Sequence, residues 1–240
     1  MLRCIRSAVA LFIVLAPVML AVPQTAQNAA VNDDSDWWSI IRDNSAGEAF
    51  KPREEDVADL NFTVLGITVG NDELAAIQGK LGKATVITRG DAGTARSQIC
   101  YMGADSRTHL NFESGEVQYA FYLFSDGPNW NGSDLCTKTR LVTNSLSTGS
   151  GLRLGQSPAQ VRAILGEPTK SLQDGDLIYF RQVQKRTSAA DLKRLRQYYS
   201  NLSDQKFHEE WDSYNLTAYI VAKFSDSRLV YLGVSRSETN

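Results

Sequence analysis

The two histidines are the first residues to test for chemistry, because an imidazole can serve as a metal ligand or as an acid–base group near neutral pH. His109 lies beside Leu110 in an apolar segment, and His208 lies in a polar run over 205–210. Neither has another histidine or a cysteine at the spacing of a metal site. Two glutamates follow His208, but no second histidine follows at helical spacing, which excludes a zincin motif. We therefore expect structural roles for both histidines and no metal ion.

The sequence motifs of covalent catalysis and of cofactor binding are missing. There is no Gly-x-Ser-x-Gly nucleophile elbow. Gly149, Gly151 and Gly155 approach a dinucleotide-binding fingerprint, but the third glycine comes one position late and no βαβ pattern surrounds it. We therefore expect a protein that is not an enzyme and that needs no cofactor. The alternative is a hydrolase whose carboxylates converge from separate loops, with the candidates Asp91, Asp105 and Asp174.

The N-terminal segment is typical of a secretory signal peptide. Arg3 and Arg6 precede an apolar run over residues 8–21, which is shorter than a normal transmembrane helix. We expect residues 1–26 to be removed on export, so that the mature protein is periplasmic or secreted. A single N-terminal membrane anchor is the alternative interpretation.

The cysteines fit an exported protein. Cys4 lies inside the expected signal peptide, and its removal leaves Cys100 and Cys136. An even number of cysteines in an exported chain favours a disulfide, so we expect Cys100 to pair with Cys136. Two separate buried thiols are the alternative.

The charged residues limit the class of partner. The 240-residue chain has a formal net charge of −2, which argues against binding to nucleic acid or to an anionic membrane in bulk. One basic cluster lies in and before the segment 188–199, and it is a candidate docking patch for a partner protein or for lipid head-groups. The alternative is an ordinary solvated helix face. The patch consists of Lys193, Arg194 and Arg196, with Lys185 and Arg186 just before it.

Aromatic residues give a second set of candidate contacts. The segment 119–124 is apolar on both faces of the strand that we expect there, and core packing accounts for only one of these faces. Tyr122 and Phe124 belong to the other face, while Trp130 and Trp211 lie in expected loops. Because aromatic side chains are common anchors of protein interfaces, all four are candidate partner-binding residues.

The elements that position these residues are clearest in the segment Gly151–Pro168. Ser157 is a good N-cap and Gln160 completes a capping box, with Pro158 between them at the first helical position. An apolar stripe follows, and Gly166 suits the left-handed position that ends a helix. The segment predicts a helix of about two to three turns, which must pack on another element to be stable.

A degenerate copy of this segment occurs upstream, at residues 66–84. Its glycines at 66 and 70 match those at 151 and 155, and both copies end their apolar stripe with Leu-Gly. The hairpins expected downstream of the two copies also resemble one another. Because internal repeats determine the whole fold, we expect an α+β protein of two pseudo-repeated units, each a short helical region packed on an antiparallel sheet.

The motif Gly-Leu-x-x-Gly-x-Ser-x-x-x-Val-x-x-x-Leu-Gly-x-Pro, followed by an antiparallel hairpin, resembles the BamE-type outer-membrane lipoprotein domain. That domain is related to each half of the bacterial β-lactamase-inhibitor protein, which is a tandem duplication. The resemblance covers residues 61–236 and implies a protein-binding or assembly module. The chain departs from the BamE type in lacking a lipobox cysteine.

We therefore expect a non-enzymatic exported module that binds another protein of the bacterial cell envelope through sheet and loop surfaces. The alternatives are the hydrolase named above and a structural protein that interacts with anionic lipid. The expected segments are a signal peptide at 1–26, a linker and N-terminal arm at 27–59, a first unit at 60–149, and a second unit at 150–240 with an inserted helix near 188–199. Strands are expected at 62–69, 85–88, 97–102, 108–112, 117–124, 136–142, 177–182, 215–224 and 228–234.

Overall fold

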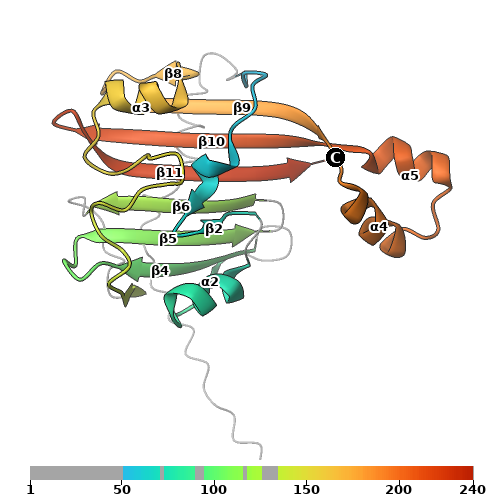
Figure 1. Cartoon of the computed structure of the whole chain (residues 1–240), viewed down its shortest axis with the longest axis horizontal. Helices are drawn as coiled ribbons and strands as arrows, with labels where there is room; N and C mark the ends of the chain where they lie inside the picture. Colours follow the sequence, from blue (N-terminus) through green and yellow to red (C-terminus); the bar gives the residue numbers. More distant parts are fainter. Residues whose placement is uncertain (1–50, 71–72, 90–94, 116–117, 126–134, 240) are drawn as a thin grey trace, which may run out of the picture. The chain divides into compact units, whose positions relative to one another are not determined.

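The computed structural model describes residues 51–70, 73–89, 95–115, 118–125 and 135–239, and Figure 1 shows how their helices and strands are arranged. The expected signal peptide 1–26, most of the expected arm 27–59 and Trp130 lie outside the described residues. The described part has an α+β fold, in which four α-helices accompany a large antiparallel sheet.

The sheet is a nine-stranded ladder whose path is β3-β4-β5-β6-β11-β10-β9-β8, and β7 pairs with β4 beside this path. Neighbours along the path are antiparallel, while β7 runs parallel to β4. The strands are β3 (Ile87–Arg89), β4 (Arg96–Met102), β5 (Thr108–Gly115), β6 (Gln118–Ser125), β7 (Thr137–Lys138), β8 (Lys170–Ser171), β9 (Leu177–Arg186), β10 (Ser213–Ser225) and β11 (Arg228–Thr239).

The two halves of the chain join in the middle of this sheet, where β6 pairs with β11. The register of this pair runs from Gln118 opposite Ser237 to Phe124 opposite Tyr231. β11 also pairs with β10 through the two-residue turn 226–227, and both turn residues have positive φ, as a tight hairpin between right-twisted strands requires. Strands from both halves therefore form one continuous sheet.

Two short helices lie over one face of the sheet and enclose the core. α2 (Leu74–Leu81) buries Ile77 and Leu81, and α3 (Pro158–Leu165) buries Val161. These side chains form one cluster with alternate residues of the central strands, because successive side chains of a strand point to opposite faces. The packing supplies the stability that helices of eight residues lack on their own.

The predicted capping box of α3 is confirmed. Gln160 N donates to Ser157 Oγ at 3.3 Å, and Ser157 N donates to Gln160 Oε1 at 2.8 Å. Pro158 occupies the first helical position, and Gly166 ends the helix with a φ of +77°. Local sequence signals therefore determine both ends of α3.

The C-terminal ends of α2 and α3 are tied to the sheet by tyrosines. Tyr101 of β4 donates its hydroxyl proton to the carbonyl of Gly82 at 2.7 Å, and Tyr179 of β9 donates to the carbonyl of Gly166 at 3.3 Å. Burial raises the pKa of both phenols, that of Tyr179 to about 12. Both hydroxyls therefore stay protonated at neutral pH and act as permanent donors.

The region before α2 is not the continuous strand expected at 62–69. It consists of the 3-10 helix η1 (Asp59–Phe62) and a small ribbon of β1 (Thr63–Val64) and β2 (Ile67–Thr68). Residues 65 and 66 reverse the chain, and both have positive φ. The turn was not predicted, because the hydrophobic pattern of the segment indicates which residues are buried and does not indicate where the chain turns.

The expected disulfide between Cys100 and Cys136 is present. It connects β4 to the residue just before β7. The strand expected at 136–142 is reduced to the two residues of β7, which run beside Tyr101 and Met102. The covalent bond explains why so short a strand keeps its place, since it fixes the chain next to β4.

Two helices stand between β9 and β10, where one was expected near 188–199. α4 (Ala189–Tyr198) confirms that helix, and α5 (Asp204–Trp211) is an addition to it. The polar run expected around His208 is the body of α5. This helix buries only Phe207, so its apolar pattern was too weak to recognise in the sequence.

Candidate functional site

The helices α4 and α5 form a hairpin that extends beyond the ends of β9 and β10, as Figure 1 shows at the right-hand side of the sheet. The backbone N–H of Thr187 donates to the carbonyl of Asp212 at 2.9 Å and closes the base of this hairpin. α4, which the structure describes throughout, has no buried residue. An element so exposed contributes little to the core, and it is the first candidate for a contact with another molecule.

The hairpin is held together at its tip by Arg196. Its guanidinium donates to the carbonyl of Leu202 at 2.9 Å, pairs with Asp204 and lies over the ring of Phe207, 4.9 Å from the centroid. Ser203 caps α5 by accepting from the backbone N–H of Lys206. Arg196 therefore stabilises the hairpin itself, and its expected role in an external docking patch stays a prediction.

Trp211 also has a place inside the hairpin. It was expected in a loop, but it is the last residue of α5, where its half-buried ring stacks on Tyr199 with the centroids 4.6 Å apart. The stack joins the two helices close to the loop that follows α4. This contact was not predictable, because Tyr199 follows α4 whereas Trp211 ends α5.

The exposed surface of α4 keeps the other two residues of the expected patch. Lys193 is exposed, and the Arg194 side chain is 69% exposed while it pairs with Asp191 at 3.0 Å within the same helix. Tyr198 is 78% exposed, more than any other large hydrophobic residue of the described chain. Tyr198 was not predicted as a contact residue, because it lies outside the apolar stripe of α4. An aromatic residue on the polar face of a predicted helix is the signal that could have identified it.

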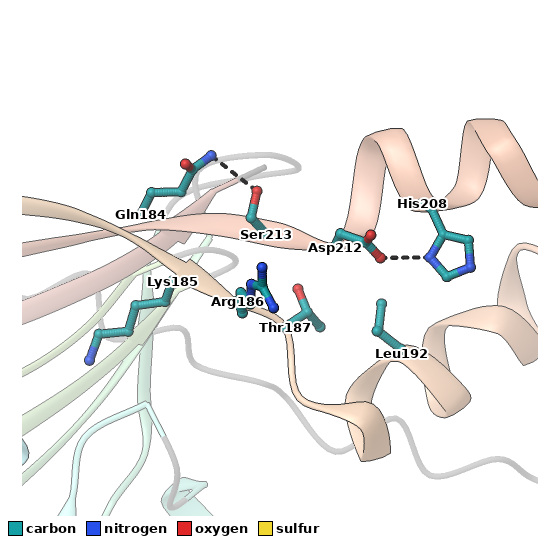
Figure 2. A pocket seen from close by; sticks show the side chains of 8 residues that line it. All are labelled: Gln184, Lys185, Arg186, Thr187, Leu192, His208, Asp212 and Ser213. Atoms are coloured by element: carbon teal, nitrogen blue, oxygen red, sulfur yellow. Dashed lines mark hydrogen bonds and ion pairs between the residues drawn. The ribbon is translucent and has the colours of Figure 1, made fainter.

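An open pocket of about 790 Å³ lies at the base of the hairpin. Figure 2 shows His208 and Asp212 facing one another along the last turn of α5, with Nδ1 and Oδ1 2.6 Å apart. On the neighbouring strands, the Gln184 amide donates to Ser213 Oγ at 3.0 Å. The pocket is lined by Gln184, Lys185, Arg186, Thr187, Leu192, His208, Asp212 and Ser213.

Polar and charged side chains form most of the pocket lining. The His208 and Asp212 side chains are 58% and 57% exposed, so water screens their interaction. Lys185 is turned to a different partner and pairs with Asp56 at 3.1 Å. Within the described residues, the His208 ring bonds to Asp212 and to no hydroxyl group, and no three His, Cys, Asp or Glu side chains are grouped to hold a metal ion.

Tyr122 and Phe124 do not form the open contact surface that was expected. They are 2% and 8% exposed, and they pack with Ala120 and Val221 on the face of the sheet opposite to Phe121. The expectation assumed that one face of β6 would stay open. That face is buried as well, and on it Phe124 stacks on the fully buried His109 of the neighbouring strand, with centroids 5.1 Å apart.

The carboxylates of the alternative hydrolase serve turns in the described chain. Asp105 accepts the backbone N–H groups of Arg107 and Thr108 at 2.9 and 3.0 Å, and these bonds lower the pKa of its carboxyl. Asp174 accepts the backbone N–H of Asp176 at 3.1 Å. Asp91 lies outside the described residues.

The hairpin thus brings together Lys193, Arg194, Arg196 and Trp211 of the residues singled out from the sequence, while Tyr122 and Phe124 lie elsewhere, in the interior. Among the described residues, no helix has the length and apolar character needed to cross a membrane. Comparisons of the chain with protein-family models, with curated proteins and with solved structures give no match.

Proposed function

We propose that the chain is a non-catalytic, exported protein-binding module whose contact element is the α4–α5 hairpin. The observation that carries this proposal is the exposure of α4, a ten-residue helix without a buried residue that presents Tyr198 at 78% exposure. Helices of this length are marginal in isolation, and exposed aromatic residues are common interface anchors. A protein surface that packs on the hairpin would supply the burial that α4 lacks.

The charge of the hairpin favours a protein partner over an anionic membrane. Between β9 and β10, five acidic residues balance four basic ones, so the hairpin has no net positive field to attract lipid head-groups. Arg196 is also bonded inside the hairpin. The acidic residues are Asp191, Asp204, Glu209, Glu210 and Asp212, and the basic residues are Lys193, Arg194, Arg196 and Lys206.

The proposal includes the two-unit pseudo-repeat, for which the strand path gives support. Reading inward from each edge, β3-β4-β5-β6 and β8-β9-β10-β11 have the same sequence of connections, and each set is preceded by one helix, α2 or α3. The matched glycines at 66 and 151, 70 and 155, and 82 and 166 all have positive φ. At the C-terminal end of each helix, a tyrosine hydroxyl donates a hydrogen bond to the carbonyl of the glycine that ends the helix.

In a pseudo-repeat, the hairpin is a part of the second unit that has no counterpart between the matching strands of the first. β4 and β5 are joined by a short turn over residues 103–107, whereas β9 and β10, their counterparts, are joined by residues 187–212. Insertions in loops on a rigid scaffold are where proteins of one fold acquire separate functions. The repeat also supports the resemblance to BamE-type and inhibitor-type domains, and with it a binding role.

Export to the periplasm or the exterior is supported by the disulfide. Disulfides persist in oxidising compartments and are rare in the cytosol. Cys100 and Cys136 close a 36-residue separation within the first half of the sheet, where a bond of this kind stabilises a small unit.

A photo-crosslinking amino acid at position 198 tests the proposed function in cells that produce the full chain. We expect a covalent protein adduct on irradiation, identified by mass spectrometry after denaturing purification. The matched control places the same amino acid at Val86, which is 46% exposed and distant in the sequence from the hairpin. Absence of a protein adduct at 198, an adduct with lipid alone, or equal adducts at both positions would contradict the proposal.

A further inference from the structure

The two helices of the hairpin have opposite charge. α4 contains three basic residues and one acidic residue, whereas α5 contains three acidic residues and one basic residue. The basic residues of the hairpin are therefore concentrated on α4 and the acidic residues on α5. A second hairpin in the appropriate orientation would present the opposite charge to each of them.

Two of the three basic residues of α4 form ion pairs, and the third, Lys193, forms none within the described residues. Within the described residues, Arg196–Asp204 is the ion pair that joins α4 to α5, and it lies at the tip. Arg194 pairs with Asp191 inside α4, and Lys193 and Glu210 have no ion-pair partner in the described part of the chain. Lys193, Glu210 and the exposed side chain of Arg194 therefore remain available for complementary charges from another molecule.

We propose that the hairpin docks on the hairpin of a second copy of this chain, with α4 of each copy against α5 of the other. This inference rests on the proposed function and names its partner. A two-fold axis produces the α4–α5 contact twice, so each basic helix meets an acidic one. The alternative two-fold arrangement, α4 against α4, would place like charges opposite each other. Tyr198, at the end of α4, supplies apolar area to be buried in the contact.

The contact would be weak and sensitive to salt. Two short helices from each copy bury less than a standard stable interface, and exposed ion pairs contribute only modestly. Added salt screens such pairs because the Debye length falls from about 10 Å at 0.1 M to about 3 Å at 1 M. We expect a concentration-dependent monomer–dimer equilibrium that shifts to monomer as the salt concentration rises.

The test is a charge-exchange experiment in sedimentation velocity. One variant carries Lys193→Glu and Arg194→Glu, and a second carries Glu209→Lys and Glu210→Lys. Each alone would meet like charge in both copies of the contact and should be monomeric at concentrations at which the wild type dimerises. In an equimolar mixture, a dimer made of one copy of each variant has opposite charges in both α4–α5 contacts. We therefore expect a species with the mass of a dimer.

A matched control variant carries Lys138→Glu and Arg140→Glu, two exposed basic residues on the strand and loop after the disulfide. It should dimerise like the wild type. Melting temperatures of all variants establish that each is folded. A wild type that stays monomeric, or a mixture that is no more associated than its components, would overturn the proposal.

The two proposals fail in different ways. A monomeric wild type that still forms an adduct with a different protein at position 198 overturns self-association but keeps the binding role of the hairpin. A monomeric wild type without any protein adduct at 198 overturns both. An adduct of doubled mass that contains this chain alone supports both.

Discussion

At the scale of residues, the ionisation of a buried carboxyl affects the stability of the fold. Asp176 is 7% exposed and accepts the backbone N–H of Phe224 at 2.8 Å, next to the start of β9. Burial raises the pKa of its carboxyl, and the nearby Asp174 adds to this, while the Phe224 bond and Lys223 act in the opposite direction. The Asp176 carboxyl stabilises the fold as a hydrogen-bond acceptor, but its negative charge is destabilising because the side chain is buried.

The substitution Asp176→Asn should keep a hydrogen-bond acceptor for the Phe224 N–H and remove the buried negative charge. Because the folded pKa is raised above the unfolded value of 3.8, ionisation of Asp176 lowers the stability of the wild type once the pH rises through this range. We expect an unfolding free energy at pH 7 equal to or above that of the wild type, with the difference vanishing at pH values below 3.8. Denaturant titrations at both pH values provide the measurement.

Asp176→Ala is the matched control, because it removes the acceptor and leaves the Phe224 N–H unsatisfied. It should lower the unfolding free energy by about 1–3 kcal/mol. If the Asn and Ala variants were equally destabilised, the acceptor role assigned to this carboxyl would be wrong.

At the scale of elements, short helices depend on a few bonds at their ends. Tyr101→Phe and Tyr179→Phe each remove a hydroxyl that bonds the terminal carbonyl of a covering helix. Each change should lower the unfolding free energy by about 1 kcal/mol, with the larger effect for Tyr101 because its bond is shorter. The effects should add in the double variant, because the two tyrosines bond different helices.

Thermal and denaturant unfolding of the three variants checks this prediction. Tyr198→Phe is the control, since that side chain is 78% exposed and its hydroxyl is not part of the core. A control as destabilised as the other two, or a strongly non-additive double variant, would show that the helix ends are held in a different way.

The disulfide should hold β7 against β4. Replacing both Cys100 and Cys136 by Ala removes a cross-link with a sequence separation of 36 residues and should lower the unfolding free energy by about 2–4 kcal/mol. Hydrogen exchange at Thr139, whose N–H donates to Met102 O at 2.8 Å, should become faster than in the wild type. A reductant should destabilise the wild type and leave the double variant unchanged, and an equal effect on both would argue against the cross-link.

Elements whose signals are local were predictable from the sequence, and elements that depend on distant partners were not. Ser157, Pro158, Gln160 and Gly166 lie within ten residues and determine both ends of α3. α5 depends on stacking and on Arg196, which belongs to another helix. For the same reason, the sequence predicted a basic patch on one inserted helix but neither the second helix nor the bonds of Arg196 to residues that follow α4.

At the scale of the whole described unit, strand order decides which distant side chains meet. The pairing of β6 with β11 puts the rings of Tyr122 and Phe124 beside Tyr231, which is more than one hundred positions away in sequence, with centroids 6.2 and 6.1 Å apart. Arg236 of β11 also crosses between the halves, with its guanidinium 5.9 Å from the ring centroid of Phe62. Such pairings cannot be deduced from hydrophobic periodicity.

The same strand order makes the hairpin separable from the sheet. Arg186 and Ser213 are directly opposite in the β9–β10 ladder, so a two-residue Asn-Gly turn could join them in place of residues 187–212. The scaffold would then retain its core cluster, to which neither α4 nor α5 contributes a buried residue.

This replacement tests whether the hairpin is a contact element added to a sheet that folds without it. The measurement is chemical crosslinking in producing cells, followed by detection of the chain and its adducts, with the melting temperature of the purified variant. We predict a folded protein that melts cooperatively and forms none of the adducts seen with the wild type. A variant that fails to fold would show that the sheet needs the hairpin, and one that folds and forms the wild-type adducts would show that the contact element lies elsewhere.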